Sequence, residues 1–132
     1  MKNLLLISIA LFFAICSKSW ALPYYNGTFS CVVKAGITMQ FEKPGLAPKD
    51  FVFHINREKD SDVLKIIGDG ANIANSTLKI VDELGSKLLA YKFPYQDASS
   101  LVWYDGKFIL SVSNGLALLN WTFAGSCKKL DF

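Results

Sequence analysis

Apolar and polar residues alternate along most of the chain in short runs, and no segment keeps a helical period for more than a few residues. Glycine, proline, asparagine or aspartate bounds each run. Before residue 100 the runs occupy 28–34, 37–41, 51–57, 63–67, 77–81 and 87–93. Such alternation predicts half-buried β-strands joined by turns. With the strands expected after residue 100, the pattern indicates about eight or nine strands at a spacing of roughly ten residues.

Two tight-turn signals, Asp105-Gly106 and Asn114-Gly115, lie close together near the C-terminus. An Asx-Gly pair between apolar runs favours a two-residue type I′ turn, because both central residues of that turn need positive φ. Counting outward from the first turn places Trp103 opposite Phe108. A slip of one residue would expose the whole apolar face, so we expect this register to be firmly held.

The second turn, counted as a two-residue turn, places Phe108 opposite Trp121 and Leu110 opposite Leu119. Trp103, Phe108 and Trp121 then form a row across three strands on the inner face. That row either lines a pocket for an apolar ligand or fills the core. Core filling is favoured because a small core needs large side chains.

The same count turns Cys127 inward, and Cys31 lies on the apolar side of the first strand. A disulfide between these two cysteines would therefore join the first and last strands. The sequence predicts an all-β fold of about eight or nine short strands with one disulfide. The two candidates are a small antiparallel β-barrel, built as a lipocalin or calycin-like meander, and a closed sandwich. Closure is favoured because it removes exposed strand edges.

The first 21 residues, MKNLLLISIALFFAICSKSWA, have a lysine, an apolar run and a small-x-small site, which is typical of a signal peptide. The run is short for a membrane span, and Ile15 is bulky for a lipoprotein site at Cys16. We expect a signal peptide over 1–21, a single all-β domain over 22–132, and no transmembrane segment after cleavage. The localisation is then periplasmic or extracellular, where a disulfide persists.

Loss of Lys2 and Lys18 with the signal lowers the formal net charge from +3 to +1. The longest basic run, Lys128-Lys129, is two residues, so a nucleic-acid partner is not expected. A protein partner or a small apolar ligand suits such a surface better. Three glycosylation sequons begin at Asn26, Asn75 and Asn120, and their use depends on the source of the protein.

No catalytic, metal or cofactor site is predicted. The single histidine, His54, is expected on an outward face, about 13 Å from the nearest carboxylates on that face. Five carboxylates are expected in turns, where their side chains bond to the backbone: Asp69, Asp82, Glu83, Asp97 and Asp105. The stretches 58–62 and 68–72 have too few oxygen ligands for a calcium loop.

The stretch SSLVWYDGKFILSVSNGLAL, with an early and a late cysteine, resembles the periplasmic inhibitors of C-type lysozyme. Ser100 and Tyr104-Asp105-Gly106 match one motif of that family, and Asn114-Gly115 with Ala117 matches part of another. The resemblance implies a small β-barrel with a disulfide joining its ends. Val112 and Asn114 stand where the family has a tryptophan and its functional lysine, so the inhibitory activity does not carry over directly.

These observations together predict an exported barrel that binds a protein of the cell envelope or a small apolar ligand without catalysis. One alternative is an inhibitor of a lysozyme-like or other extracellular hydrolase. A second is an enzyme that uses the turn carboxylates. In each case we expect the function in the less regular segments, 42–50, 68–76 and 94–100.

Overall fold

The computed structural model describes residues 24–40, 43–92, 97–114 and 118–131. The expected signal peptide, residues 1–21, lies outside the described residues, as do Gly115 and Ala117. All regular structure in the described part of the chain is β-structure. Its nine strands are β1 (Gly27–Gln40), β2 (Lys43–Leu46), β3 (Val52–Arg57), β4 (Val63–Ile67), β5 (Ser76–Leu84), β6 (Lys87–Lys92), β7 (Asp97–Tyr104), β8 (Lys107–Asn114) and β9 (Leu119–Lys129).

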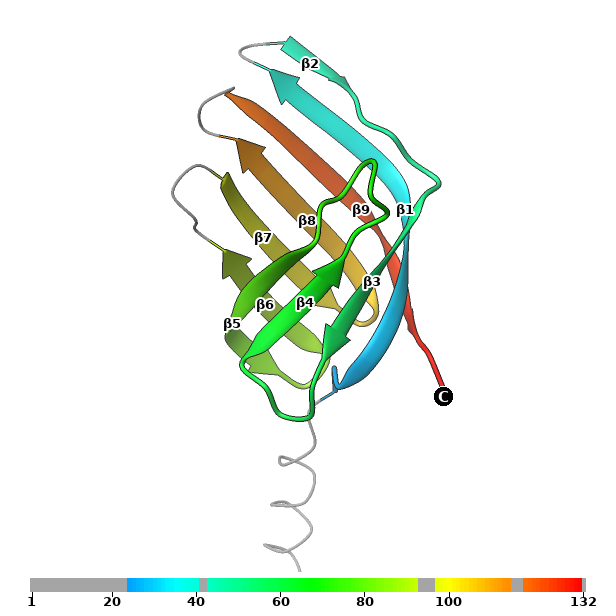
Figure 1. The fold of residues 1–132 in the computed structure, drawn as a ribbon, viewed down its shortest axis with the longest axis vertical. Helices are drawn as coiled ribbons and strands as arrows, with labels where there is room; N and C mark the ends of the chain where they lie inside the picture. Colours follow the sequence, from blue (N-terminus) through cyan, green and yellow to red (C-terminus); the bar gives the residue numbers. More distant parts are fainter. Residues whose placement is uncertain (1–23, 41–42, 93–96, 115–117, 132) are drawn as a thin grey trace, which may run out of the picture.

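The strands form a closed antiparallel barrel (Figure 1). Strands β3 to β9 follow one another around the wall, and β1 pairs with β3 on one side and β9 on the other. Eight strands therefore close the barrel. The additional strand, β2, pairs with the C-terminal part of β1, from Ile37 to Gln40. The all-β prediction is confirmed, and the structure is the barrel rather than the closed sandwich.

β1 is longer than the sequence predicts, because the two expected strands 28–34 and 37–41 are one element. Its register against β9 shifts between Val33 and Ala35, as at a β-bulge. A bulge inserts one residue and reverses which alternate side chains face inward. Ile37 and Met39 consequently face outward, with 59% and 44% of their surfaces exposed. The expected loop 42–50 also contains a strand, β2, which pairs with β1 beyond the bulge.

A disulfide between Cys31 and Cys127 crosses the seam where β1 meets β9, as the sequence predicts. The two residues are direct register partners, with their Cα atoms 4.0 Å apart. It ties the first strand of the barrel to the last, across 96 residues of sequence.

The hairpin between β7 and β8 has the predicted register, with Trp103 opposite Phe108 around the turn Asp105-Gly106. Both turn residues have positive φ, 50° and 78°, as a type I′ turn requires.

The register predicted between β8 and β9 is wrong: Phe108 pairs with Gly125 and Val112 with Trp121. Four residues, rather than two, separate Asn114 from its partner Leu119. Gly125 suits the position opposite Phe108, because a Cβ there would lie 3.0 Å from the Phe108 ring and 1.9 Å from the Val32 carbonyl oxygen of β1. The shift is an even number of residues, so the apolar residues of β9 still face inward.

Aromatic side chains fill one end of the barrel, near the N-terminus of the described chain. Tyr25 is fully buried and stacks on Trp103, with ring centroids 3.8 Å apart. Phe29 meets the same indole edge-on at 4.7 Å, and Phe53 meets Phe108 edge-on at 5.2 Å. We call this the closed end: residues 24–26 with the turns 58–62, 85–86 and 105–106. Two of its turns are joined through the Tyr25 hydroxyl, which donates to the Ser86 carbonyl (2.5 Å) and accepts from the Gly106 amide (3.3 Å).

An ion pair between Arg57 and Glu83 also lies at the closed end. The guanidinium makes two parallel bonds to the carboxylate, at 2.5 and 2.9 Å, and also donates to the carbonyls of Ser61 and Tyr25. Arg57 is 5% exposed and the side chain of Glu83 is 21% exposed.

Three carboxylates expected in turns lie in strands instead: Asp82 and Glu83 in β5, and Asp97 at the start of β7. The register of β5 shifts between Ile80 and Asp82, which turns Glu83 to the inner face opposite buried Leu88. The bulge therefore gives Arg57 its partner. Asp69 and Asp105 do lie outside the strands, as expected.

Candidate functional site

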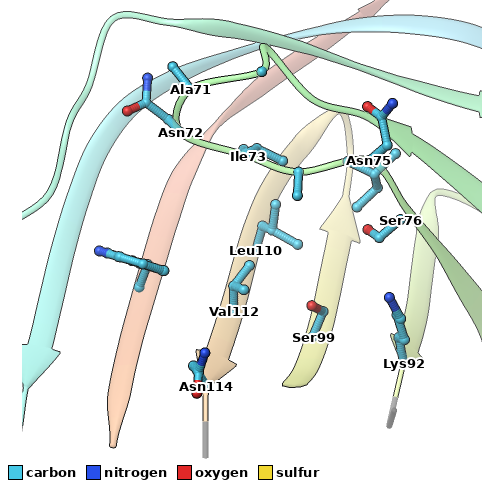
Figure 2. A pocket seen from close by; sticks show the side chains of 14 residues that line it. Ala71, Asn72, Ile73, Asn75, Ser76, Lys92, Ser99, Leu110, Val112 and Asn114 are labelled. Carbon is cyan, nitrogen blue, oxygen red and sulfur yellow. The ribbon is translucent and has the colours of Figure 1, made fainter. Parts of the chain in front are cut away.

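A cavity of about 360 Å³ opens at the end of the barrel opposite the closed end (Figure 2). It lies between the loop 68–75, which joins β4 to β5, and the inner faces of β6 to β9. Its volume falls within the range of small-molecule sites, roughly 300–1,000 Å³. Fourteen described residues line it: Ile66, Gly70, Ala71, Asn72, Ile73, Ala74, Asn75, Ser76, Lys92, Ser99, Leu110, Val112, Asn114 and Trp121.

Apolar side chains form much of the cavity wall. Leu110 and Val112 follow Phe108 along the inner face of β8, so the wall continues directly from the core. Figure 2 shows Leu110 and Val112 one above the other beneath the loop that carries Ile73. Trp121, on β9, is the register partner of Val112 and is only partly buried. These groups offer a binding surface for hydrocarbon or an aromatic ring.

Polar side chains occupy the β6, β7 and loop sides of the same cavity. Lys92 is the last residue of β6 and pairs with Ser99 of β7, which is 9% exposed. Asn72 and Ser76 face the cavity from the loop and from β5. Within the described part of the chain, the lining contains a lysine and no aspartate or glutamate. The cavity is therefore apolar on one side and cationic on the other.

The loop 68–75, which we call the roof loop, has an internal scaffold centred on Asp69. The Oδ1 atom accepts the backbone N–H groups of Ala71, Asn72 and Ile73 at 2.7–3.1 Å, and Oδ2 accepts the Asn72 side-chain amide at 2.8 Å. These bonds, from Asn72 first and Ile73 second, lower the pKa of the Asp69 carboxyl to about 2.

Two further contacts hold the roof loop over the cavity. The Oδ1 atom of Asn75 accepts the Gly68 amide at 2.8 Å, which closes the base of the loop. Ile73 is 5% exposed and packs into the core from above. A Cβ on Gly68 would lie 1.6 Å from the Ile73 carbonyl oxygen, so the loop needs glycine there. The roof loop is consequently a built element of the cavity rather than a loose connection.

The structure separates the three aromatic residues that the sequence placed in one row. Trp103 and Phe108, 0% and 2% exposed, lie in the core at the closed end. Trp121 is four residues along β9 from Gly125, the partner of Phe108, and lines the cavity instead. The row that does cross the cavity, by register, is Lys92, Ser99, Val112 and Trp121.

His54 lies on the outer face of β3, between its register partners Ser30 and Ile67. The nearby carboxylate of Asp50 pairs with Lys34 at 3.8 Å. The described residues contain no group of three histidine, cysteine, aspartate or glutamate side chains that could hold a metal ion. Asp69, in one of the stretches considered for calcium, uses its oxygens within the roof loop.

The residues of the lysozyme-inhibitor resemblance lie at both ends of the barrel. Tyr104, Asp105 and Gly106 belong to the β7–β8 turn at the closed end. Val112 and Asn114 line the cavity. The sequons begin at Asn26 in the closed end, at Asn75 in the roof loop, and at Asn120, which bonds to Ser111 and Ser113.

Sequence reasoning did not identify Lys92 or Ser99 as site residues. The available signal was parity: Lys92 alternates with Leu88 and Ala90, which are buried. A lysine on the inward-facing side of a barrel strand indicates a polar or ligand-facing position. That argument needs the inner face of this strand to be known, and both of its faces are apolar in sequence.

Comparison with known proteins found no matching family model, no matching curated protein and no matching solved structure. No helix among the described residues has the length and hydrophobicity that a membrane span requires.

Proposed function

We propose that this protein binds a small, largely apolar molecule in the cavity at the open end of the barrel, without catalysis. The observation that carries the proposal is the cavity itself. It combines an apolar wall, a few convergent polar groups and a structured roof loop. Small-molecule sites are commonly built in this way, and the mouth of a β-barrel is a common place for them.

The distribution of stabilising contacts supports the same assignment. The disulfide, the aromatic stack and the Arg57–Glu83 pair all lie away from the cavity. At the other end, Val112 and Trp121 line the cavity and are only partly buried. Apolar surface left facing a cavity gains free energy when a ligand covers it, at about 25 cal/mol per Å².

Filling the cavity tests the proposal. Ser99 faces the cavity, and the adjacent Ser100 is exposed on the outer face, so Ser99→Phe and Ser100→Phe form a matched pair. The neutral fluorescent probe N-phenyl-1-naphthylamine should bind the unmodified protein and Ser100→Phe with similar affinity. Ser99→Phe should weaken binding at least tenfold, because the new ring occupies the ligand space. Tryptophan emission should change on probe binding in the first two proteins, because Trp121 lines the cavity.

Thermal unfolding of both variants is the control for folding. Equal probe affinity in a folded Ser99→Phe protein and in Ser100→Phe would contradict the proposal. No probe binding by the unmodified protein, together with no co-purified small molecule in native mass spectrometry, would contradict it as well.

A further inference from the structure

Lys92 is the one charged residue among the described residues that line the mouth of the barrel. Its register partner is Ser99, and the two inward-facing residues before it on β6, Leu88 and Ala90, are 0% and 2% exposed. Figure 2 shows its side-chain nitrogen pointing up from β6 toward Ser76, into the cavity. Lys92 is therefore placed by strand parity, and its ammonium faces the space that a ligand would occupy.

Among the described lining residues, no acidic side chain balances the charge of Lys92. Lys92 takes part in neither ion pair found among the described residues, Lys34–Asp50 or Arg57–Glu83. A cation that loses water on ligand binding needs a compensating anion or hydrogen bonds. A ligand that brought its own anionic group would meet that need with a charge-assisted hydrogen bond.

The side of the cavity formed by β8 and β9 favours hydrocarbon. Lys92, Ser99, Val112 and Trp121 are successive register partners across β6, β7, β8 and β9. Three strand spacings, about 14 Å along the curved wall, separate the first from the last. The row begins with a cation, continues with a hydroxyl, and ends with a methyl-bearing side chain and an indole. The geometry is that of a site with one charged pole and one apolar pole.

We propose that the cavity binds small carboxylates with an apolar body, with the carboxylate on Lys92 and the body against Val112 and Trp121. This inference rests on the function proposed above and specifies the ligand class. A single lysine suits a carboxylate head group, because a multiply charged phosphate favours several cations or a bidentate arginine. The hydroxyl of Ser99, beside Lys92, supplies a second donor for the same head group.

Octanoate, 1-octanol and octylamine, which share a chain length and differ in charge, are suitable probes for isothermal titration calorimetry. We expect the unmodified protein to bind octanoate at least tenfold more tightly than 1-octanol and to bind octylamine most weakly. Lys92→Met should remove the preference for octanoate and leave the affinity for 1-octanol within about twofold. Lys92→Glu should reverse the preference toward octylamine. Lys107→Met, an exposed lysine at the start of β8 near the closed end, is the matched control and should change nothing.

Equal affinities of the unmodified protein for octanoate and 1-octanol would overturn the carboxylate assignment and leave the proposed function standing. So would an unchanged octanoate preference in Lys92→Met. Failure of all three probes and of N-phenyl-1-naphthylamine would overturn the proposed function itself. The comparison of ligands on the unmodified protein needs no variant, so a poorly folded variant does not prevent the test.

Discussion

At the scale of single residues, Arg57 is the clearest example of a side chain whose role depends on distant partners. It is buried at the end of β3 and reaches Glu83 on β5, the carbonyl of Ser61, and the carbonyl of Tyr25 in the N-terminal segment. Buried charges are tolerated when they are paired and hydrogen-bonded, as here. The pair therefore connects three separate segments at the closed end.

Removing one member of this pair should be strongly destabilising. We expect Glu83→Gln to lower the free energy of unfolding by about 3 kcal/mol, because the guanidinium of Arg57 then stays buried without a counter-charge. Urea unfolding measures the difference. The double variant Arg57→Met with Glu83→Leu should be closer in stability to the unmodified protein than Glu83→Gln is. A Glu83→Gln protein as stable as the unmodified one would show that the pair is dispensable.

Asp69 should couple the order of the roof loop to pH. Its pKa in the folded protein, about 2, lies below the ordinary aspartate value of 3.8, so folding favours the charged carboxylate. The stabilisation it gives is present above about pH 4 and is lost as the pH falls toward 2. Amide chemical shifts of Ala71, Asn72 and Ile73 should report this transition. Asp69→Ala should speed exchange of those three amides at neutral pH, and Asp82→Ala, an exposed carboxylate on β5, should not.

Sequence predicted the site unevenly at this scale. The turn chemistry of Asp105-Gly106 and the outward position of His54 could be predicted, since both depend on local rules. The inward position of Glu83 could not, because a bulge two residues earlier reverses the alternation. The inward position of Lys92 could not be predicted either. Both faces of its strand are apolar in sequence, and only the closed barrel shows which face is the inner one.

At the scale of elements, the seam between β1 and β9 is central to closing the barrel. It has the longest register of any strand pair, from Phe29–Lys129 to Gln40–Leu119, and the disulfide lies within it. Gly125 lies on the same strand, where close approach of Val32 leaves no room for a side chain. The disulfide and Gly125 therefore both restrict how β9 pairs with β1, and the Gly125 position also lies against Phe108 of β8.

Loss of the disulfide should lower stability mainly by increasing the conformational entropy of the unfolded chain. The double variant Cys31→Ala with Cys127→Ala should lower the free energy of unfolding by about 4–5 kcal/mol, because the bond closes a loop of about 100 residues. Chemical unfolding with and without reductant measures this in parallel. The reduced unmodified protein is the internal control and should match the double variant. A loss below about 1 kcal/mol in both would contradict the assigned role of the seam.

The register predicted between β8 and β9 was wrong because a local rule was outweighed by packing elsewhere in the barrel. The Asn114-Gly115 pair indicates a two-residue turn by local rules, yet the connection to Leu119 is longer. The free energy gained from a preferred turn is small compared with that of the packing around Gly125, which lies between Val32 and Phe108. The inner-face composition was still predicted well, since a shift by an even number of residues leaves every side chain on its own face.

At the scale of the whole molecule, the two ends of the barrel differ in chemistry. The closed end holds an aromatic stack, a buried ion pair, and a Tyr25 hydroxyl that donates to the Ser86 carbonyl and accepts from the Gly106 amide. Burial raises the pKa of the Tyr25 phenol, although the Gly106 amide acts in the opposite direction. The neutral phenol is thus favoured by folding, and its contribution is present below about pH 10 and lost as the pH rises further.

The separation of the two ends has a consequence for how this chain can change. Under the function proposed above, ligand preference depends on cavity residues such as Ser99, Lys92 and Val112. These residues take no part in the disulfide, in the Arg57 pair or in the stack on Trp103. Mutations that alter ligand preference should therefore carry a small folding penalty. If the proposed function holds, the lining of the cavity can be changed by mutation or design while the contacts that stabilise the fold stay the same.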